Sequence, residues 1–513
     1  MKIRSCVKMT LAGVLLVTAV LGSRRVEGTE FVFTSRRVVR VNGRRGVADR
    51  AEFGKLLLRR SNGQIVTLVD ASAPNAPLTT PVDVSDPDVS FDGTRVVFSG
   101  YSGEERTWRI YEVGINGGGL RQITENHSQP YIERHGEATS RLRGSEDLDP
   151  CYLPDGRICF VSTRYPTVAP DGRMRGTNLY VVNADGTDVH RITSERFGAD
   201  TPAVDPTTGE IVYSRWWRSS PVERTDGDTR PVQPGSPGYG GSPDRPRPPG
   251  DPSGDPAVHP SASRTLAESD FPGVNSWFLA RIRPDGTEMA MFSGFRLDRE
   301  ATQSYRPSFG PNGETFALFI PLSPRMGTPG PNGLRLYDRG PSLPQNLAGP
   351  QSFLRGREGV PLEHVSFASA RPIDRQRLLV SASMRGTTEH DIFVFDRVFN
   401  TLSAIVAMPD AQLDAVPIDP RPLPPVLEDK EDIRPLLDYS PRTVEEAFSE
   451  GGSFTFAVDN IFFNADVDEP LPNAPPAIPG LKIEFFMAPQ LTSPNGADEP
   501  ILIESVEIPR NGK

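Results

Sequence analysis

The stretch DPCYLPDGRICFVSTRY (Asp149 to Tyr165) decides the fold, because it opens a unit that the chain repeats. Its first eight residues align without a gap with DPDVSFDG (Asp86 to Gly93). Later in the unit, YVVNADGTDVHRIT (Tyr180 to Thr193) aligns without a gap with YEVGINGGGLRQIT (Tyr111 to Thr124). Each unit therefore runs as strand, Asp-Gly turn, strand, longer loop, strand, Gly turn and strand, since glycine reaches the positive φ that tight hairpin turns need. Four antiparallel strands per repeat predict the blade of a β-propeller.

Looser copies extend the pattern to six blades. Three of these are expected from residues 199–217 with 276–294, 304–320 with 332–340, and 363–383 with 390–407. GTEFVFTSR (Gly28 to Arg36) matches the second strand of a blade, GRICFVSTR (Gly156 to Arg164), so the first blade begins without an inner strand. LDAVPIDP (Leu413 to Pro420) resembles an inner strand, and we expect it to pair beside residue 32 and leave no open sheet edge. The sequence thus predicts an all-β protein with a six-bladed propeller over residues 29–425, closed by a C-terminal inner strand.

Composition and charge agree with a turn-dense β protein. Gly (47) and Pro (52) together make up about a fifth of the 513 residues, against a usual share of roughly 12%. The formal net charge of -10 comes from scattered residues of both signs, without a long basic run. This pattern argues against a helical bundle and against a nucleic-acid-binding surface.

The N-terminus has the layout of a secretory signal peptide. Lys2, Arg4 and Lys8 precede an apolar stretch over residues 10–21, which is too short to span a bilayer. We expect residues 1–28 to contain a signal peptide that is cleaved after Gly22 or after Gly28, leaving a periplasmic or secreted chain with no stable membrane insertion. A retained signal anchor is the alternative.

Two segments fall outside the repeats. Residues 219–264 are dominated by Pro, Gly, Asp and Ser and are expected to form a disordered insertion, because they offer too little apolar surface to offset the entropy of ordering. Residues 426–513 begin as a Pro-rich linker and continue with SFTFAVDNIFF, LKIEFFMAP and ILIESVEIP, which predict strands of a small, partial β-sandwich-like tail.

The motifs DPCYLPDGRICFVSTRY, NLYVVNADGTDVHRIT and IVYSRWW resemble the WD40-like (PD40) repeats of TolB-like propellers. More closely, residues 29–425 resemble the middle domain of the hydrazine synthase alpha-subunit family. The resemblance implies a six-bladed propeller in an exported protein, with c-type haem carried by flanking regions. This sequence has no Cys-x-x-Cys-His and only three cysteines, whereas covalent haem attachment needs two thioethers and an axial His. The family's haem chemistry is therefore not carried over, and we expect no cofactor.

One face of the propeller is the candidate binding surface. Loops that join the second and third strands of a blade, and loops that join successive blades, emerge together on this face, while the short turns emerge on the other. Side chains just past the second strands are expected to gather there, and they are of the kinds that recur at binding hot spots: Arg36, Tyr101, Arg164, Tyr165, Arg215, Trp216 and Trp217. The alternative is that these side chains pack between blades and cap loops.

Cysteine and histidine give two further hypotheses. If Pro154-Asp155-Gly156 forms a three-residue loop, Cys151 lies directly across from Cys159, and an oxidising compartment would permit a disulfide. A two-residue loop would place the two cysteines on opposite faces. Histidines at 127 and 135, with glutamates at 125 and 133, lack a third ligand fixed by sequence, so we expect solvated loop residues and no metal.

The sequence therefore favours a binding or scaffolding propeller that presents its loop face to a protein partner or a small-molecule ligand, with no chemistry of its own. It contains no Gly-x-Ser-x-Gly, phosphate loop or His-Glu-x-x-His. The alternative is an enzyme, either a subunit that completes a periplasmic redox complex or a propeller hydrolase.

Overall fold

The computed structural model describes residues 28–41, 44–47, 53–126, 143–166, 175–195, 198–218, 275–292, 303–320, 333–337, 345–349, 360–362, 365–384, 390–430, 482–487 and 501–507. The regular elements in these ranges are all β-strands. Within them, no helix has the length and apolar character needed to cross a membrane.

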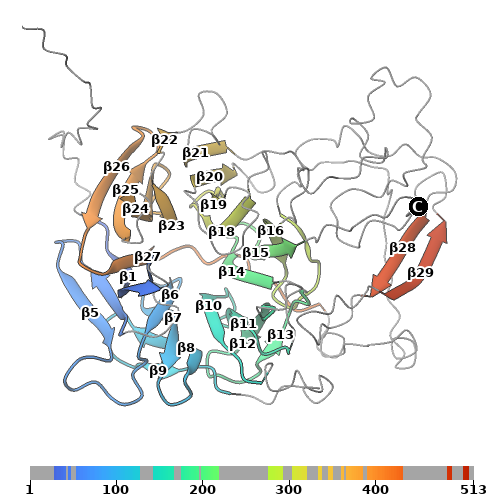
Figure 1. The fold of residues 1–513 in the computed structure, drawn as a ribbon, viewed down its shortest axis with the longest axis horizontal. Coiled ribbons are helices and arrows are strands. Elements are labelled where there is room, and N and C mark those ends of the chain that lie inside the picture. The colour runs from blue at the N-terminus through green and yellow to red at the C-terminus, as the bar shows by residue number, and fades with distance from the viewer. Residues whose placement is uncertain are drawn as a thin grey trace, which may run out of the picture.

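Six antiparallel sheets surround one axis, each forming a blade of a β-propeller (Figure 1). Blade 1 consists of β27 (Ala411–Pro417), β1 (Phe31–Arg36), β4 (Lys55–Arg59) and β5 (Ile65–Asp70). Blade 2 consists of β6 (Val84–Val89), β7 (Arg95–Ser102), β8 (Thr107–Gly114) and β9 (Arg121–Gln122). Blade 3 consists of β10 (Asp147–Tyr152), β11 (Ile158–Ser162), β12 (Asn178–Val182) and β13 (His190–Arg191).

The second half of the ring repeats this order. Blade 4 consists of β14 (Gly198–Val204), β15 (Ile211–Arg218), β16 (Asn275–Ile282) and β17 (Ala290–Met291). Blade 5 consists of β18 (Gln303–Phe309), β19 (Thr315–Ile320), β20 (Gly333–Tyr337) and β21 (Gln345–Gly349), with β22 (Val360–Pro361) added parallel to β21. Blade 6 consists of β23 (Ser366–Pro372), β24 (Arg377–Ser383), β25 (His390–Asp396) and β26 (Thr401–Val406).

Two hairpins stand outside the six blades. One joins β2 (Val38–Val41) to β3 (Arg44–Val47) and lies between β1 and β4 in the chain. The other joins β28 (Lys482–Met487) to β29 (Ile501–Glu507), which confirms two of the strands predicted for the C-terminal tail. The N-terminal segment before residue 28, the insertion over 219–264 and the tail strand over 453–463 lie outside the described residues.

The ring closes as the sequence predicts. β27 pairs antiparallel with β1, and Val416 lies opposite Val32. The hydroxyl of Thr34 also donates to the carbonyl of Leu413 at 3.3 Å. Because β1 is hydrogen-bonded on both sides, by β27 and β4, blade 1 leaves no inner edge open to another chain.

Apolar residues form six clusters, and each cluster fills one interface between neighbouring blades. Side chains along a strand alternate between its two faces, so each blade packs against both neighbours. In β1, Phe31 and Phe33 face blade 6, while Val32 faces blade 2. Each fully buried Phe or Val side chain contributes about 1.5–3 kcal/mol, so the packing of β1 against both neighbours stabilises the closed ring.

Short turns and longer loops occupy opposite faces, which we call the turn face and the loop face. The turn face carries the predicted glycine turns, with φ of 82° at Gly117 and 89° at Gly186. Gly156 also has a positive φ of 91°, and the amide of Leu153 donates to the carbonyl of Arg157 at 2.8 Å. This is the three-residue loop that places Cys151 directly opposite Cys159.

Both cysteines are buried, and a hydrogen bond between the Cys151 thiol and Cys159, together with burial, raises the pKa of Cys151 well above its usual value. The predicted register of the pair is therefore correct. The structure holds the pair as thiols, so the disulfide stays a prediction.

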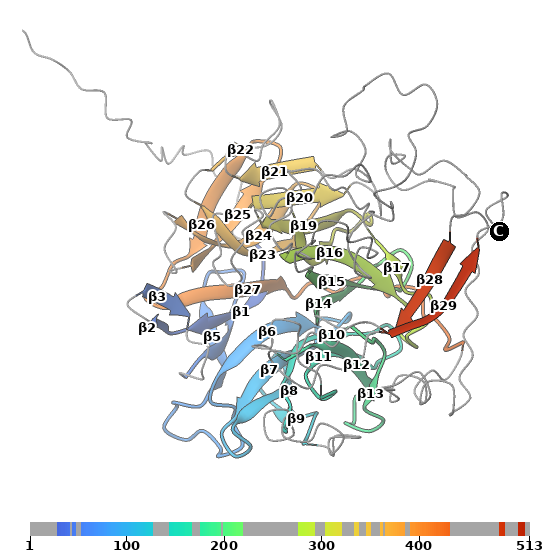
Figure 2. The ribbon, with the colours of Figure 1, turned by 45° about the vertical axis from the view of Figure 1, so that its right-hand side comes forward.

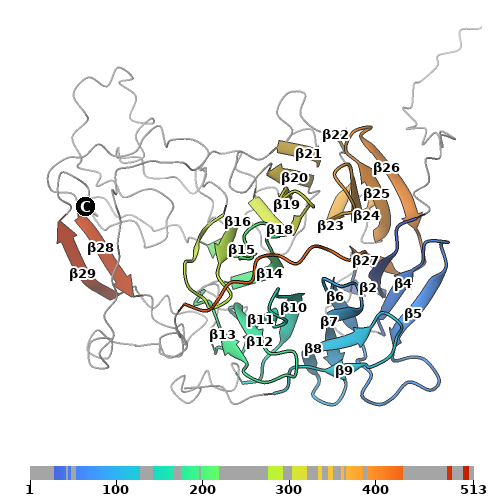
Figure 3. The ribbon, with the colours of Figure 1, turned by 180° about the vertical axis from the view of Figure 1, so that it is seen from behind.

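Residues 418–430, which we call the strap, leave β27 and cross the turn face to blade 4 (Figure 3). The amide of Arg421 donates to the carbonyl of Phe91 in blade 2 at 2.8 Å. Further along, Asp429 forms an ion pair with Arg157 of blade 3 at 2.9 Å, and the amide of Lys430 donates to Asp285 of blade 4 at 2.6 Å. Prolines fix φ along this segment and favour an extended chain, which suits a span across three blades.

Candidate functional site

The central axis is the first place to look for a site in a propeller, and here it is filled. The inner strands β6, β10, β14 and β27 come together at the middle of the ring in Figure 2. Every inner strand carries a β-bulge at this point. The bulge residue has a positive φ in five of the six strands, at Asp86, Asp149, Thr201, Arg306 and Asp414. In four strands that residue precedes a proline, a position at which helical backbone angles are disfavoured.

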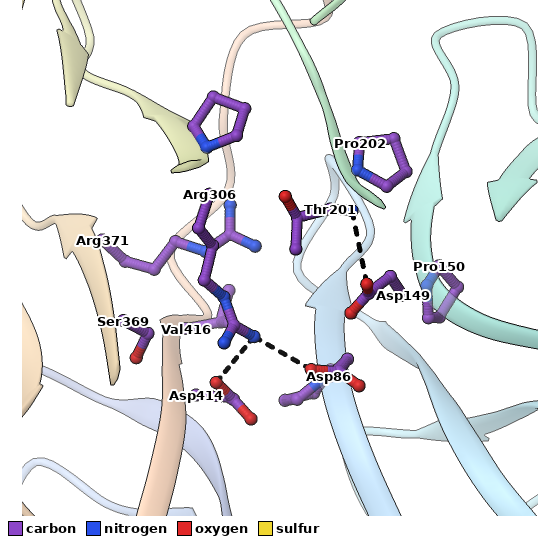
Figure 4. Close-up of a pocket in the computed structure, with 12 residues that line it drawn as sticks. Asp86, Asp149, Pro150, Thr201, Pro202, Arg306, Ser369, Arg371, Asp414 and Val416 are labelled. Atoms are coloured by element: carbon purple, nitrogen blue, oxygen red, sulfur yellow. Dashed lines mark hydrogen bonds and ion pairs between the residues drawn. The ribbon is translucent and has the colours of Figure 1, made fainter. Parts of the chain in front are cut away.

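An ion-pair network closes the axis (Figure 4). Arg306 contacts Asp86 at 2.9 Å and Asp414 at 2.7 Å, which ties blade 5 to blades 2 and 1. Burial alone would lower the pKa of Arg306, but the two carboxylates raise it above its usual value. Burial and the neighbouring charge of Asp86 raise the pKa of Asp149 well above its usual range. The remaining cavity of about 20 Å³ has room for about one water molecule, so the axis is a structural plug.

A larger pocket lies on the loop face between blades 2 and 3. It has a volume of about 480 Å³ and is lined by the β7–β8 loop, by the connection that enters blade 3, and by residues that precede β12. Its charged lining residues are Glu105, Arg106, Arg109, Arg143, Glu146 and Arg175. Among the described lining residues, four arginines stand against two glutamates, so this part of the pocket is positive although the whole chain carries a net charge of -10.

Arg109 forms the floor of this pocket. It is 1% exposed, and its Nε donates to Glu105 at 2.8 Å. Its Nη1 donates to the carbonyl of Ser145 at 2.8 Å and lies 3.6 Å from Asp147. Because carboxylates on two sides compensate its charge, Arg109 braces blade 2 against the connection to blade 3.

Arg175 is held differently. Its Nη1 donates to the carbonyl of Gly144 at 2.8 Å, and its Nη2 donates to the carbonyl of Thr163. Its buried Nε has no hydrogen-bond partner among the described residues. Burial lowers the pKa of Arg175 to about 10, and the charge of Glu146 offsets this only in part. The guanidinium is therefore well positioned but poorly neutralised.

The residues predicted from the ends of second strands are mostly engaged in packing. Arg36 forms an ion pair with Asp83 at 2.9 Å and lies 5.4 Å from the ring centroid of Trp108. Tyr101 meets the same indole edge-on at 5.7 Å. Arg164 binds Asp147 through two hydrogen bonds, of 2.9 and 2.6 Å.

The remaining predicted residues follow the same pattern. The guanidinium carbon of Arg191 lies over the ring of Tyr165, 3.6 Å from the centroid of that ring. Arg215 forms an ion pair with Glu195 at 2.9 Å, and the ring of Trp216 stacks on that of Trp277 at 5.9 Å. Trp217 lies opposite Ser276 in the β15–β16 ladder. Their role in binding stays a prediction.

Two details of the sequence prediction need correction or addition. Five of the predicted residues lie within second strands rather than beyond them, because β1, β7 and β15 continue to Arg36, Ser102 and Arg218: Arg36, Tyr101, Arg215, Trp216 and Trp217. The pocket arginines were not predicted, although the repeat carries a signal for them. Arg106 stands five residues before Tyr111 and Arg175 five residues before Tyr180, so the two occupy equivalent positions of the aligned repeat.

The described residues contain no group of three His, Cys, Asp or Glu side chains that could hold a metal ion. His127, Glu133 and His135 lie outside the described residues. Glu125 is described, and its backbone carbonyl accepts from Arg164 at 2.7 Å.

Comparison with known proteins supports the fold. No family model and no curated protein matches the sequence. Among solved structures, the chain is similar to hydrazine synthase of Kuenenia stuttgartiensis, with a TM-score of 0.52 and 13% identity over 78% of this chain and 48% of that one. It therefore spans about half the length of that protein. TolB from Acinetobacter baumannii matches with a TM-score of 0.36 and 11% identity, over 76% of this chain and 67% of that one. The β-propeller domain of the Trilobed protease from Pyrococcus furiosus matches with a TM-score of 0.33 and 11% identity, over 74% and 86% respectively.

Proposed function

We propose that this chain is an exported binding or scaffolding protein that presents its loop face to a protein partner or a small-molecule ligand. The observation that carries the proposal is the pocket of about 480 Å³ between blades 2 and 3, on the face where the longer loops emerge. Pockets of this size are typical of ligand sites. The axis, by contrast, offers only about 20 Å³.

Ion pairs within the chain support a loop face that is held in place around the pocket. Three arginines of the predicted loop-face set lie outside the pocket. Each forms an ion pair with a carboxylate of the protein: Arg36 with Asp83, Arg164 with Asp147, and Arg215 with Glu195. Such pairs hold the loops in place around the pocket. Export rests on the N-terminal pattern of basic and apolar residues, and it is part of the proposal.

A redox complex is the second candidate. The observation in its favour is the structural similarity to hydrazine synthase, at a TM-score of 0.52. Since the sequence lacks a Cys-x-x-Cys-His motif, the chain would supply a docking surface and not a covalently attached haem.

Capture from the native envelope fraction tests both candidates. The full chain is immobilised beside a loop-face variant, Arg106→Glu with Arg143→Glu, and a turn-face control, Arg375→Glu, all three positions being exposed. We expect the wild type and the control to retain the same bound species, and the loop-face variant to lose it. Equal capture by all three proteins would refute the loop-face assignment. Haem absorption in the captured material would favour the redox complex.

A further inference from the structure

We propose that the pocket between blades 2 and 3 binds an oxyanion group, a carboxylate or a phosphate, with Arg175 as its main charge partner and Arg106 as the second. The inference rests on the proposed binding function and specifies its ligand chemistry. It follows from the contrast between Arg175 and the other arginines of the same face.

The first argument is charge compensation. Arg109, Arg164 and Arg215 lie on the same face, and each forms a close ion pair with a carboxylate: Glu105 at 2.8 Å, Asp147 at 2.6 Å and Glu195 at 2.9 Å. Arg175 forms no ion pair with any described residue, and its polar contacts are the backbone carbonyls of Gly144 and Thr163. A partly buried cation that no described carboxylate pairs with is costly, since the charge of Glu146 offsets its burial only in part, and an anion that enters the pocket reduces that cost.

The second argument is that the glutamates of the pocket do not fill this role. Glu105 accepts from Arg109 at 2.8 Å and from the side-chain amide of Gln122 at 2.7 Å, so its oxygens are occupied. Glu146 is exposed at the rim, and partial desolvation raises its pKa in spite of Arg175 and Arg109. The described lining of the pocket therefore keeps a positive charge that favours an anionic ligand.

The third argument is geometric. Arg106 and Arg175 come from equivalent repeat positions of neighbouring blades, and both line the pocket. The amide of Arg106 donates to the carbonyl of Ser102 at 2.8 Å, which closes the turn that carries it. Arg175 is fixed by its two carbonyl contacts. Two guanidinium groups on fixed backbone are suited to the paired oxygens of a carboxylate or phosphate.

Calorimetric titration of the full chain tests the proposal, with inorganic phosphate in one arm and succinate in the other, at constant ionic strength. We expect saturable binding in at least one arm, and the arm that binds identifies the anion. Arg175→Gln should weaken binding about tenfold or more, since it removes a charge-assisted hydrogen-bond donor. Arg106→Gln should weaken anion binding less than Arg175→Gln does. Because Arg106 is exposed, this variant should fold normally, so it tests the pocket even if Arg175→Gln has a folding defect.

Arg375→Gln is the matched control, because it removes one exposed positive charge from the turn face. Binding by this control should equal that of the wild type. The proposal is overturned if neither anion binds, or if both pocket variants bind as tightly as the control. If anion binding fails but partner capture still depends on Arg106 and Arg143, the ligand chemistry is wrong while the loop-face function stands. If anion binding and partner capture both fail, the oxyanion proposal and the proposed loop-face function are both wrong.

Discussion

Val32 in β1 lies directly opposite Val416 in β27, so the first blade strand of the chain and the last are neighbours in one sheet. Both side chains are buried and belong to the cluster that joins blade 1 to blade 2. This single pairing turns a row of blades into a closed ring.

A cross-link tests this register. In the double variant Val32→Cys with Val416→Cys, we expect a disulfide to form on oxidation, because directly opposite residues of an antiparallel pair meet the required Cα separation. Peptide mapping by mass spectrometry detects the bond. Val32→Cys with Ala415→Cys is the control, since neighbouring residues of a strand point to opposite faces, and it should not cross-link. Cross-linking only in the control would mean that the register is shifted.

Asp147 stabilises the junction of blades 2 and 3. It is 0% exposed and contacts Arg164 at 2.6 Å and Arg109 at 3.6 Å. Asp147→Asn keeps the shape but leaves two buried guanidinium groups without their shared charge, so the free energy of unfolding should fall by about 3 kcal/mol in urea titration.

The control for this prediction is Asp374→Asn, which alters the partly exposed ion pair with Arg377. Its effect should stay below about 1 kcal/mol, because solvent screens surface pairs. A loss at Asp147 no larger than that of the control would contradict the role assigned to the buried carboxylate.

The strap requires glycine at position 209. Gly209 has a φ of 77°, and a Cβ there would overlap the carbonyl oxygen of Pro425. Gly156 has a similar φ of 91° but nothing within 4 Å of the Cβ position, so it serves as the matched control. Gly156→Ala should cost about 1 kcal/mol from backbone strain alone.

Gly209→Ala should cost clearly more and should expose residues 418–430 to limited proteolysis, because the added methyl group displaces the strap. Equal losses of unfolding free energy in the two variants, with unchanged proteolysis, would show that the strap does not depend on this contact.

Asp200 makes stability depend on pH. Burial raises its pKa to about 6, in spite of a hydrogen bond from Thr177 at 3.0 Å. The folded state therefore holds the carboxyl proton of Asp200 more tightly than the unfolded state does. The contribution of Asp200 to the free energy of unfolding is greatest below about pH 4 and is lost as pH rises through about 6. Asp200→Asn removes that loss and should raise the free energy of unfolding by about 2 kcal/mol at pH 7.5, with no gain near pH 4.

Asp185→Asn is the control for this pH dependence. Hydrogen bonds from Thr187 lower the pKa of Asp185, so its replacement should bring no gain at high pH. Denaturant titrations of the three proteins at both pH values give the comparison, and an equal gain at pH 4 and 7.5 would rule out the assigned titration.

Sequence by itself determined the blades and their closure. The gapless repeats, the glycine turns and the match between Gly28 to Arg36 and a second strand depend on local backbone geometry and side-chain alternation, which are written in adjacent residues. The sequence left two turn lengths open between Cys151 and Cys159, and the structure decided for the three-residue loop that places them opposite each other.

Only the tertiary structure decided which charges meet. Arg106 and Arg175 are equivalent in the repeat, yet they share one pocket because blades 2 and 3 are neighbours in the ring. Asp86, Arg306 and Asp414 come from three different blades and meet only at the axis, where they plug it. Electrostatic compensation and burial depend on distances through space, and a repeat alignment does not contain those distances.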